Sequence, residues 1–145
     1  MKFICDQMLG SLAKWLRVLG YDTLYVKEDM PDEEILEIAG REERIIISRD
    51  KLLTQKGRRM KLLVIEITSI KLQDQIQQVF QHVTFNDDSI LSRCLICNNV
   101  LQPLDKKMIK DKNIPSKILD QHYQFYYCSK CNKIYWMGTH YKNMM

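Results

Sequence analysis

Glycine and proline are scarce in this chain, which has five Gly and three Pro among 145 residues. That scarcity excludes collagen-like and low-complexity sequences, and a content of 46% hydrophobic and 28% charged residues excludes intrinsic disorder. No apolar run approaches the roughly 20 residues that cross a bilayer, and the start of the chain has no apolar signal region. These absences predict a globular cytoplasmic protein with no membrane segment.

The sequence also lacks internal repeats and the glycine fingerprints of P-loop and dinucleotide-binding sites. Up to about residue 67, short β-rich apolar runs instead alternate with segments of helical periodicity, which predicts an α/β fold with a central parallel sheet. The expected strands are 2–5, 23–26, 44–48 and 62–67. We expect helices over about 9–19 and 32–39, a weaker helix after Asp50, and another over about 72–82.

The first predicted helix carries leucines at helical spacing between residues 9 and 19. On this pattern Lys14 and Arg17 are expected to face away from the core, and Gly20 to end the helix. The second predicted helix is opened by Asp29, Pro31 and Asp32.

Basic charge is concentrated in the last third of the chain. Residues 1–91 carry 13 basic and 15 acidic residues, a net charge of −2, whereas residues 92–145 carry 9 and 3, a net charge of +6. Four of the five cysteines lie in the same C-terminal part. We therefore predict two domains, 1–91 and 92–145, with the stretch 84–93 as a linker or a last short strand.

The C-terminal cysteines form two pairs, Cys94-x-x-Cys97 and Cys128-x-x-Cys131. Two such knuckles supply the four thiolates of a tetrahedral structural zinc site, and the 30 residues between them imply an additional loop or hairpin. Redox activity is the alternative, although neither pair follows a βαβ strand as a thioredoxin-type motif does. Cys5, within the first predicted strand, is expected to be a small buried side chain.

Acidic residues follow the predicted strands. Asp6 comes directly after the first strand and Asp50 follows the third, while Asp32, Glu33 and Glu34 open the helix after the second. Because ligands bind at the carboxyl edge of an open parallel sheet, these acids are expected to converge there and to hold Mg²⁺ or Mn²⁺ for phosphodiester hydrolysis. The alternative is that they only begin turns and stabilise helix N-termini.

Basic and aromatic residues offer candidate contacts to RNA. Cations can hold phosphates while neighbouring rings stack on bases, although rings on ribbon strands also form small cores and exposed charges are often only solvated. The candidates are Lys14, Arg17, Arg49, Lys130, Lys133, Trp136, His140 and Lys142.

The segments CDQMLGSLAKWLRVLGYDTLY, PDEEILEIAG, RIIISRDKLL, CLICN and YYCSKCNKIYWMGTHY occur in this order along the chain. Together they resemble the Mut-seven C-terminal RNase family, a PIN-like nuclease domain followed by a zinc ribbon. The resemblance implies a three-layer α/β/α fold and metal-dependent cleavage of RNA.

By the same resemblance, Asp6 matches the first-strand aspartate of PIN-like sites, Asp50 the aspartate of their Ser/Thr-x-Asp strand end, and Asp32 the acid that opens the intermediate helix, a role that Glu33 or Glu34 could also take. Where such nucleases often carry a further aspartate after Ser/Thr-x-Asp, this chain has Lys51 and Leu52. The alternative sources of a fourth acid are Asp74, Asp87 and Asp88.

The hypothesis at this stage is a Mg²⁺- or Mn²⁺-dependent ribonuclease with Asp6, Asp32 and Asp50 around the ion and a zinc ribbon that aids RNA binding. One alternative is an RNA- or ribosome-associated binding module with weak or no catalysis. Another is an adaptor that uses the aromatic surface of the ribbon to contact an unidentified protein.

Overall fold

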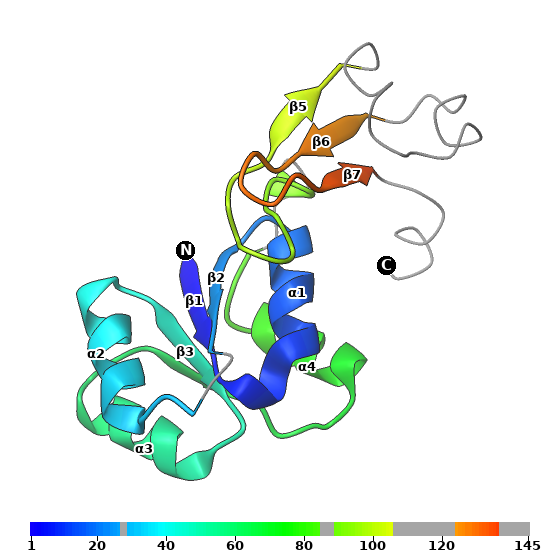
Figure 1. The fold of residues 1–145 in the computed structure, drawn as a ribbon. Helices are drawn as coiled ribbons and strands as arrows, with labels where there is room; N and C mark the ends of the chain where they lie inside the picture. The colour runs from blue at the N-terminus through cyan, green and yellow to red at the C-terminus, as the bar shows by residue number, and fades with distance from the viewer. Residues whose placement is uncertain (27–28, 85–88, 106–123, 137–145) are drawn as a thin grey trace.

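A four-stranded parallel sheet forms the centre of the computed structural model, which describes residues 1–26, 29–84, 89–105 and 124–136. Its strands lie side by side in the order β2-β1-β3-β4 (Figure 1). The predicted α/β class and parallel sheet are confirmed, with slightly different limits for three strands. The strands are β1 (Lys2–Cys5), β2 (Asp22–Tyr25), β3 (Ile45–Ser48) and β4 (Val64–Glu66).

Helices cover both faces of the sheet and make three layers (Figure 1). Leu12 and Leu16 of α1 and Val79 of α4 pack on one face, and Ile35 and Leu36 of α2 pack with Leu53 of α3 on the other. The weaker helix expected after Asp50 is present as α3. The helical elements are η1 (Gln7–Leu9), α1 (Gly10–Val18), α2 (Asp32–Arg41), α3 (Lys51–Arg59) and α4 (Leu72–Phe80).

The expected stop after α1 is present at Gly20, where the backbone has a φ of 93°. Glycine adopts this left-handed conformation without the steric cost that a Cβ imposes. A Cβ at this position would also lie 2.1 Å from the carbonyl oxygen of Ser89, so the chain after α4 approaches too closely for any other residue. Gly20 therefore allows the segment that leads to the cysteine pairs to pack beside α1.

The C-terminal ribbon, defined here as residues 92–105 and 124–136, contains a three-stranded antiparallel sheet in the order β5-β6-β7. Its strands are β5 (Gln102–Leu104), β6 (Phe125–Tyr127) and β7 (Ile134–Trp136). Most of the additional segment expected between the cysteine pairs lies outside the described residues. Among the described helices, none is both long and apolar enough to cross a bilayer.

The segment that leads into the ribbon is attached to α1 by buried contacts. Leu91 packs against Trp15 and Val18, and its N–H donates to the Val18 carbonyl oxygen at 2.7 Å. The stretch expected to be a linker is thus partly buried where it is described. The domain boundary at residues 91 and 92 remains a prediction.

Arg17 corrects the expectation that its side chain faces away from the core. Only 5% of its surface is exposed, and its guanidinium donates to three backbone carbonyl oxygens. Nε reaches Thr23 of β2 at 3.0 Å, while Nη1 reaches Leu95 at 2.7 Å and Ile96 at 3.2 Å. The carbonyl groups of the two residues between Cys94 and Cys97 require a donor at this position, and Arg17 supplies it. Arg17 thereby joins the ribbon to the sheet and is not available for an RNA phosphate.

Asn98 makes a second connection between the ribbon and β2. Its Oδ1 accepts the Thr23 N–H at 3.0 Å, and its Nδ2 donates to Asp22 Oδ1 at 2.7 Å. Asp22 also pairs with Arg44 at 2.9 Å and with Arg93 at 3.8 Å. Asn98 therefore occupies the Thr23 N–H on β2, which is an edge strand of the sheet.

Candidate functional site

An acidic pocket lies at the carboxyl edge of the parallel sheet. It encloses about 310 Å³, and four aspartates line it: Asp6, Asp29, Asp32 and Asp50. Asp6 follows β1, Asp29 and Asp32 come from the segment between β2 and α2, and Asp50 follows β3. Three acids that the sequence places at this edge thus share one cavity, because parallel strands end on the same side of a sheet.

Ser48, the last residue of β3, connects two of these aspartates. Its hydroxyl donates to Asp6 Oδ2 and accepts the N–H of Asp50 at 2.9 Å. Asp50 in turn caps α3, because its Oδ1 accepts the N–H of Leu52 at 2.9 Å. Ser48 is fully buried, so the core of the sheet determines the positions of both Asp6 and Asp50.

Asp6 is the most enclosed acid of the pocket, with 9% of its surface exposed. Burial raises the pKa of Asp6 above its ordinary value, and the nearby charge of Asp50 raises it further. Hydrogen bonds from the Ser48 hydroxyl and the Met8 N–H offset part of this rise in pKa. A buried carboxylate beside a second carboxylate is stabilised by a bound cation.

Asp32 and Asp50 differ in their surroundings. Lys56 of α3 lies 3.4 Å from Asp32 Oδ2, so a protein cation already contacts this carboxylate. Among the described residues, the four C-terminal cysteines are the one set of three or more potential ligands whose donor atoms all lie within 4.8 Å of one another. The carboxylates therefore share a pocket but stand further apart than a set closed around one ion.

The other predicted acids that the structure describes do not line this pocket. Glu33 is exposed and pairs with Lys56 at 3.5 Å, while Glu34 lines a neighbouring cavity. Asp74 accepts a hydrogen bond from Ser69 in the segment that leads into α4, and Asp87 and Asp88 lie outside the described residues. Asp29 was missed as a site residue, although its place just after the second predicted strand was a usable signal.

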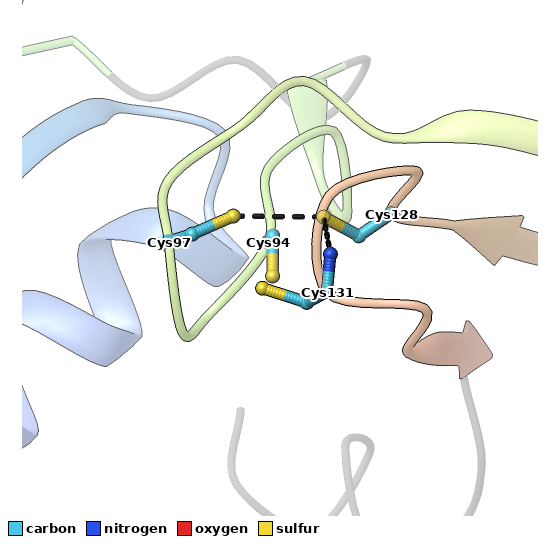
Figure 2. A group of neighbouring side chains, drawn as sticks. All are labelled: Cys94, Cys97, Cys128 and Cys131. Carbon is cyan, nitrogen blue, oxygen red and sulfur yellow. Dashed lines mark hydrogen bonds between the residues drawn. The ribbon is translucent and has the colours of Figure 1, made fainter.

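The four paired cysteines meet between the start of the ribbon and the turn that joins β6 to β7. Figure 2 shows their sulfur atoms directed toward one another, and the Sγ atoms of Cys97 and Cys128 are 3.5 Å apart. Zinc bonded to sulfur at about 2.3 Å in a tetrahedron separates the ligand atoms by about 3.8 Å, so this cluster has suitable dimensions. All five cysteines are free of disulfides, and Cys5 is buried as expected.

The two cysteine pairs have the same backbone geometry. The carbonyl oxygen of Cys94 accepts the N–H of Asn98 at 2.9 Å, and that of Cys128 accepts the N–H of Asn132 at 2.8 Å. Both asparagines have positive φ values, 71° and 57°, in the left-handed region that Asn tolerates better than most residues. The repeated Cys-x-x-Cys-Asn pattern therefore predicts two equivalent turns, a signal that sequence reasoning did not use.

Ionisation of the thiols also favours a bound cation. Burial raises the pKa of Cys94, but a hydrogen bond with the Tyr135 hydroxyl at 3.2 Å and backbone N–H groups of its own turn lower it to about 6. The adjacent Cys97 thiol and burial raise the pKa of Cys131 to about 12. Four thiolates can therefore coexist at neutral pH when a metal ion such as zinc neutralises them.

The predicted RNA contacts have different surroundings. Lys14, Lys130 and Lys133 are exposed, and Arg49 is partly exposed. The ring of Trp136 packs against Phe125 with centroids 5.9 Å apart, so packing accounts for at least part of its role. His140 and Lys142 lie outside the described residues.

A pocket lined by four aspartates at the carboxyl edge of a three-layer α/β fold, joined to a cluster of four cysteines that could hold a metal ion, defines the class of this domain. The profile of the Mut7-C RNAse domain matches residues 1–145, and the chain belongs to this family of nuclease domains. The resemblance seen in the sequence is confirmed.

One relative is the human protein named exonuclease mut-7 homolog, which is 35% identical over 103 residues. The match covers 67% of this chain but only 12% of the human protein. No solved structure matches the chain.

Proposed function

We propose that the protein is a PIN-like ribonuclease that hydrolyses RNA phosphodiester bonds with Mg²⁺ or Mn²⁺ in the acidic pocket. The observation that carries this proposal is the convergence of Asp6, Asp32 and Asp50 in one cavity of a chain from an RNase-domain family. Carboxylate oxygens suit these hard cations, so the donor chemistry of the pocket fits them. Asp29 lines the same pocket and adds a fourth acid, which the motifs of the sequence did not identify.

In this proposal Asp6, Asp32 and Asp50 hold the ion, and Asp29 is available as a further ligand. A bound divalent cation lowers the pKa of water and neutralises charge on a phosphodiester. Ser48 keeps Asp6 and Asp50 in place through its two hydrogen bonds. Asp32 pairs with Lys56 in this structure, so binding of the ion by Asp32 would replace that ion pair and leave the Lys56 ammonium group available to a phosphate oxygen.

The four cysteines hold a structural zinc ion in the same proposal. Four thiolates leave no open coordination position, so this metal supports the fold of the ribbon and takes no part in hydrolysis. The exposed Lys130 and Lys133 place positive charge beside the second cysteine pair and are positioned to bind RNA. A metal bound by Cys94 and Cys97 would also hold in place the turn whose Leu95 and Ile96 carbonyl groups Arg17 contacts.

The test is cleavage of labelled single-stranded RNA, with the same DNA sequence as a second substrate, in the presence or absence of Mg²⁺ or Mn²⁺. Zinc is kept saturating in every reaction, and the reaction without catalytic metal omits only Mg²⁺ and Mn²⁺. EDTA is not added, because it would also remove metal from the cysteines. The variant is Asp50→Asn, because Asn caps a helix as well as Asp does and α3 should remain intact. Asp74→Asn is the matched control outside the pocket.

We expect metal-dependent cleavage of RNA that falls more than about a hundredfold in Asp50→Asn, beyond the 10- to 100-fold effects of residues that only support ligands. The control should retain full activity. Cleavage that survives in Asp50→Asn would refute the assignment of the pocket.

The alternative is an RNA-binding module with little or no catalysis. The specific observation in its favour is the ion pair between Lys56 and Asp32, which occupies one proposed ligand with a protein cation. This alternative predicts equal RNA affinity in wild type and Asp50→Asn, with no cleavage under any metal condition.

A further inference from the structure

Tyr135, the middle residue of β7, contacts the cysteine cluster. Its hydroxyl oxygen lies 3.2 Å from Cys94 Sγ, and its side chain packs against the buried cysteines. Neighbouring residues of a strand point to opposite faces, and Ile134 and Trp136 accordingly pack with Phe125 in a separate apolar cluster. β7 therefore directs the side chain of Tyr135, and not those of its two neighbours, at the metal site.

The two cysteine pairs differ in the contact with Tyr135, although their backbones supply the same hydrogen bonds. The N–H groups two and three residues further along the chain are donors to the sulfur of Cys94 in the first pair and to that of Cys128 in the second. Within the part of the chain that the structure describes, a tyrosine hydroxyl is placed at Cys94 and not at Cys128. The backbone of the turns therefore does not account for the additional bond, which depends on residue 135.

The direction of this hydrogen bond follows from the chemistry of the ligand. Cysteine binds a metal ion as a thiolate, which has no proton, so the Tyr135 hydroxyl is the donor and the Cys94 sulfur the acceptor. A donor at a thiolate draws electron density away from the sulfur, and such outer contacts orient and tune metal ligands. Cys94 is fully buried, so water does not reach its sulfur to provide the same bond.

We propose that Tyr135 is a positioning residue for the metal ion, which holds the Cys94 thiolate in place through its hydroxyl. The inference rests on the cysteine metal site of the proposed function and goes beyond it, because it assigns a role to a residue that is not a ligand. β7 follows the second cysteine pair in the chain, whereas Cys94 belongs to the first. The bond thus joins the last described strand of the ribbon to the cysteine pair at its start.

The experiment compares wild type with Tyr135→Phe, which removes the hydroxyl and keeps the ring. Tyr127→Phe is the matched control on the same sheet, because the Tyr127 hydroxyl donates to Asn132 Oδ1 at 2.6 Å and not to a sulfur. Co²⁺ is the spectroscopic probe, since its bonds to thiolates give charge-transfer absorption in the near ultraviolet. Zinc affinity is measured separately, by competition against a chromophoric chelator. Neither measurement depends on cleavage of RNA.

In Tyr135→Phe we expect the charge-transfer band to move to longer wavelength, because a sulfur that has lost a hydrogen bond gives up electrons more readily. Zinc affinity should fall about tenfold, as for other residues that support metal ligands. Tyr127→Phe should keep the band of wild type. A role of Tyr135 in packing alone would leave the band in place, so an unchanged band at any zinc affinity, or an equal shift in both variants, would overturn the proposal. A wild-type protein without the band would refute the cysteine metal site of the proposed function itself.

Discussion

Replacement of Arg17 by methionine tests the connection between the ribbon and the sheet. The change keeps a long apolar side chain but removes three hydrogen bonds to the carbonyl oxygens of Thr23, Leu95 and Ile96. Hydrogen bonds that involve a charged group contribute about 1.5–3 kcal/mol each. Because water can reach the partly buried Leu95 and Ile96 bonds after the change, we expect a loss of about 3 kcal/mol in the free energy of unfolding.

A loss of this size is a large fraction of the stability of an ordinary domain, about 5–15 kcal/mol. It corresponds to a decrease in Tm of about 6 to 12 °C for a chain of this length. The metal site should be affected as well, since the carbonyl groups that Arg17 contacts belong to the turn of Cys94 and Cys97. Loss of a residue that supports metal ligands typically weakens metal affinity about 10- to 100-fold.

The assay is urea denaturation followed by circular dichroism with zinc saturating, together with competition for zinc against a chromophoric chelator. Lys14→Met is the matched control, because Lys14 lies on the same helix but is exposed. The control should change the free energy of unfolding by no more than about 0.5 kcal/mol. Equal stability and equal zinc affinity in the two variants would show that Arg17 does not join the ribbon to the sheet.

Three further predictions concern individual charges. Asp6→Asn should leave Tm unchanged or raise it while abolishing cleavage, because the raised pKa of Asp6 means that its charged form opposes folding at neutral pH; a clear fall in Tm would contradict this. Burial raises the pKa of Asp22, but hydrogen bonds from Asn98 and Arg44 lower it overall, so its contribution is present above the ordinary value of about 4 and is lost as the pH falls through the lower folded-state value. Urea denaturation across that range should show a shallower loss for Asp22→Asn than for wild type. The double change Lys130→Gln and Lys133→Gln, at exposed residues beside the second cysteine pair, should reduce the slope of RNA affinity against salt by about 1.4, or about 0.7 for each lost phosphate contact, and an unchanged slope would exclude these contacts.

The general position of the acidic pocket could be predicted because it depends on strand direction. Asp6 and Asp50 follow β1 and β3, which are hydrogen-bonded neighbours, and parallel neighbours bring their carboxyl ends together. The distances between the carboxylates of the pocket could not be predicted from the sequence. It depends on the rotamers of exposed carboxylates and on Lys56, which reaches Asp32 from a different helix.

Arg17 shows why the sequence wrongly predicted an exposed side chain at a buried position. Helical periodicity treats a charged residue as a solvent-facing one, and this rule holds where no buried acceptors are available. The acceptors of Arg17 include the carbonyl groups of residues 95 and 96, almost 80 positions further along the chain. No local pattern reports such a distant partner, so the buried position of Arg17 required the fold.

Asparagine after each cysteine pair represents an intermediate case. The repeated Cys-x-x-Cys-Asn could have indicated two turns with a left-handed fifth residue, since Asn tolerates this backbone conformation. That Asn98 also bonds to Thr23 and Asp22, whereas Asn132 bonds to Tyr127, could not have been inferred, because the difference lies in what each turn packs against.

Asn98 has a consequence for self-association of the chain. An edge strand with free N–H groups is a template for pairing with strands of other molecules, and natural proteins block such edges. Here the Thr23 N–H of β2 is occupied by a side chain whose position depends on the first cysteine turn. Displacement of this turn would therefore expose the Thr23 N–H at the edge of the sheet to strands of other molecules.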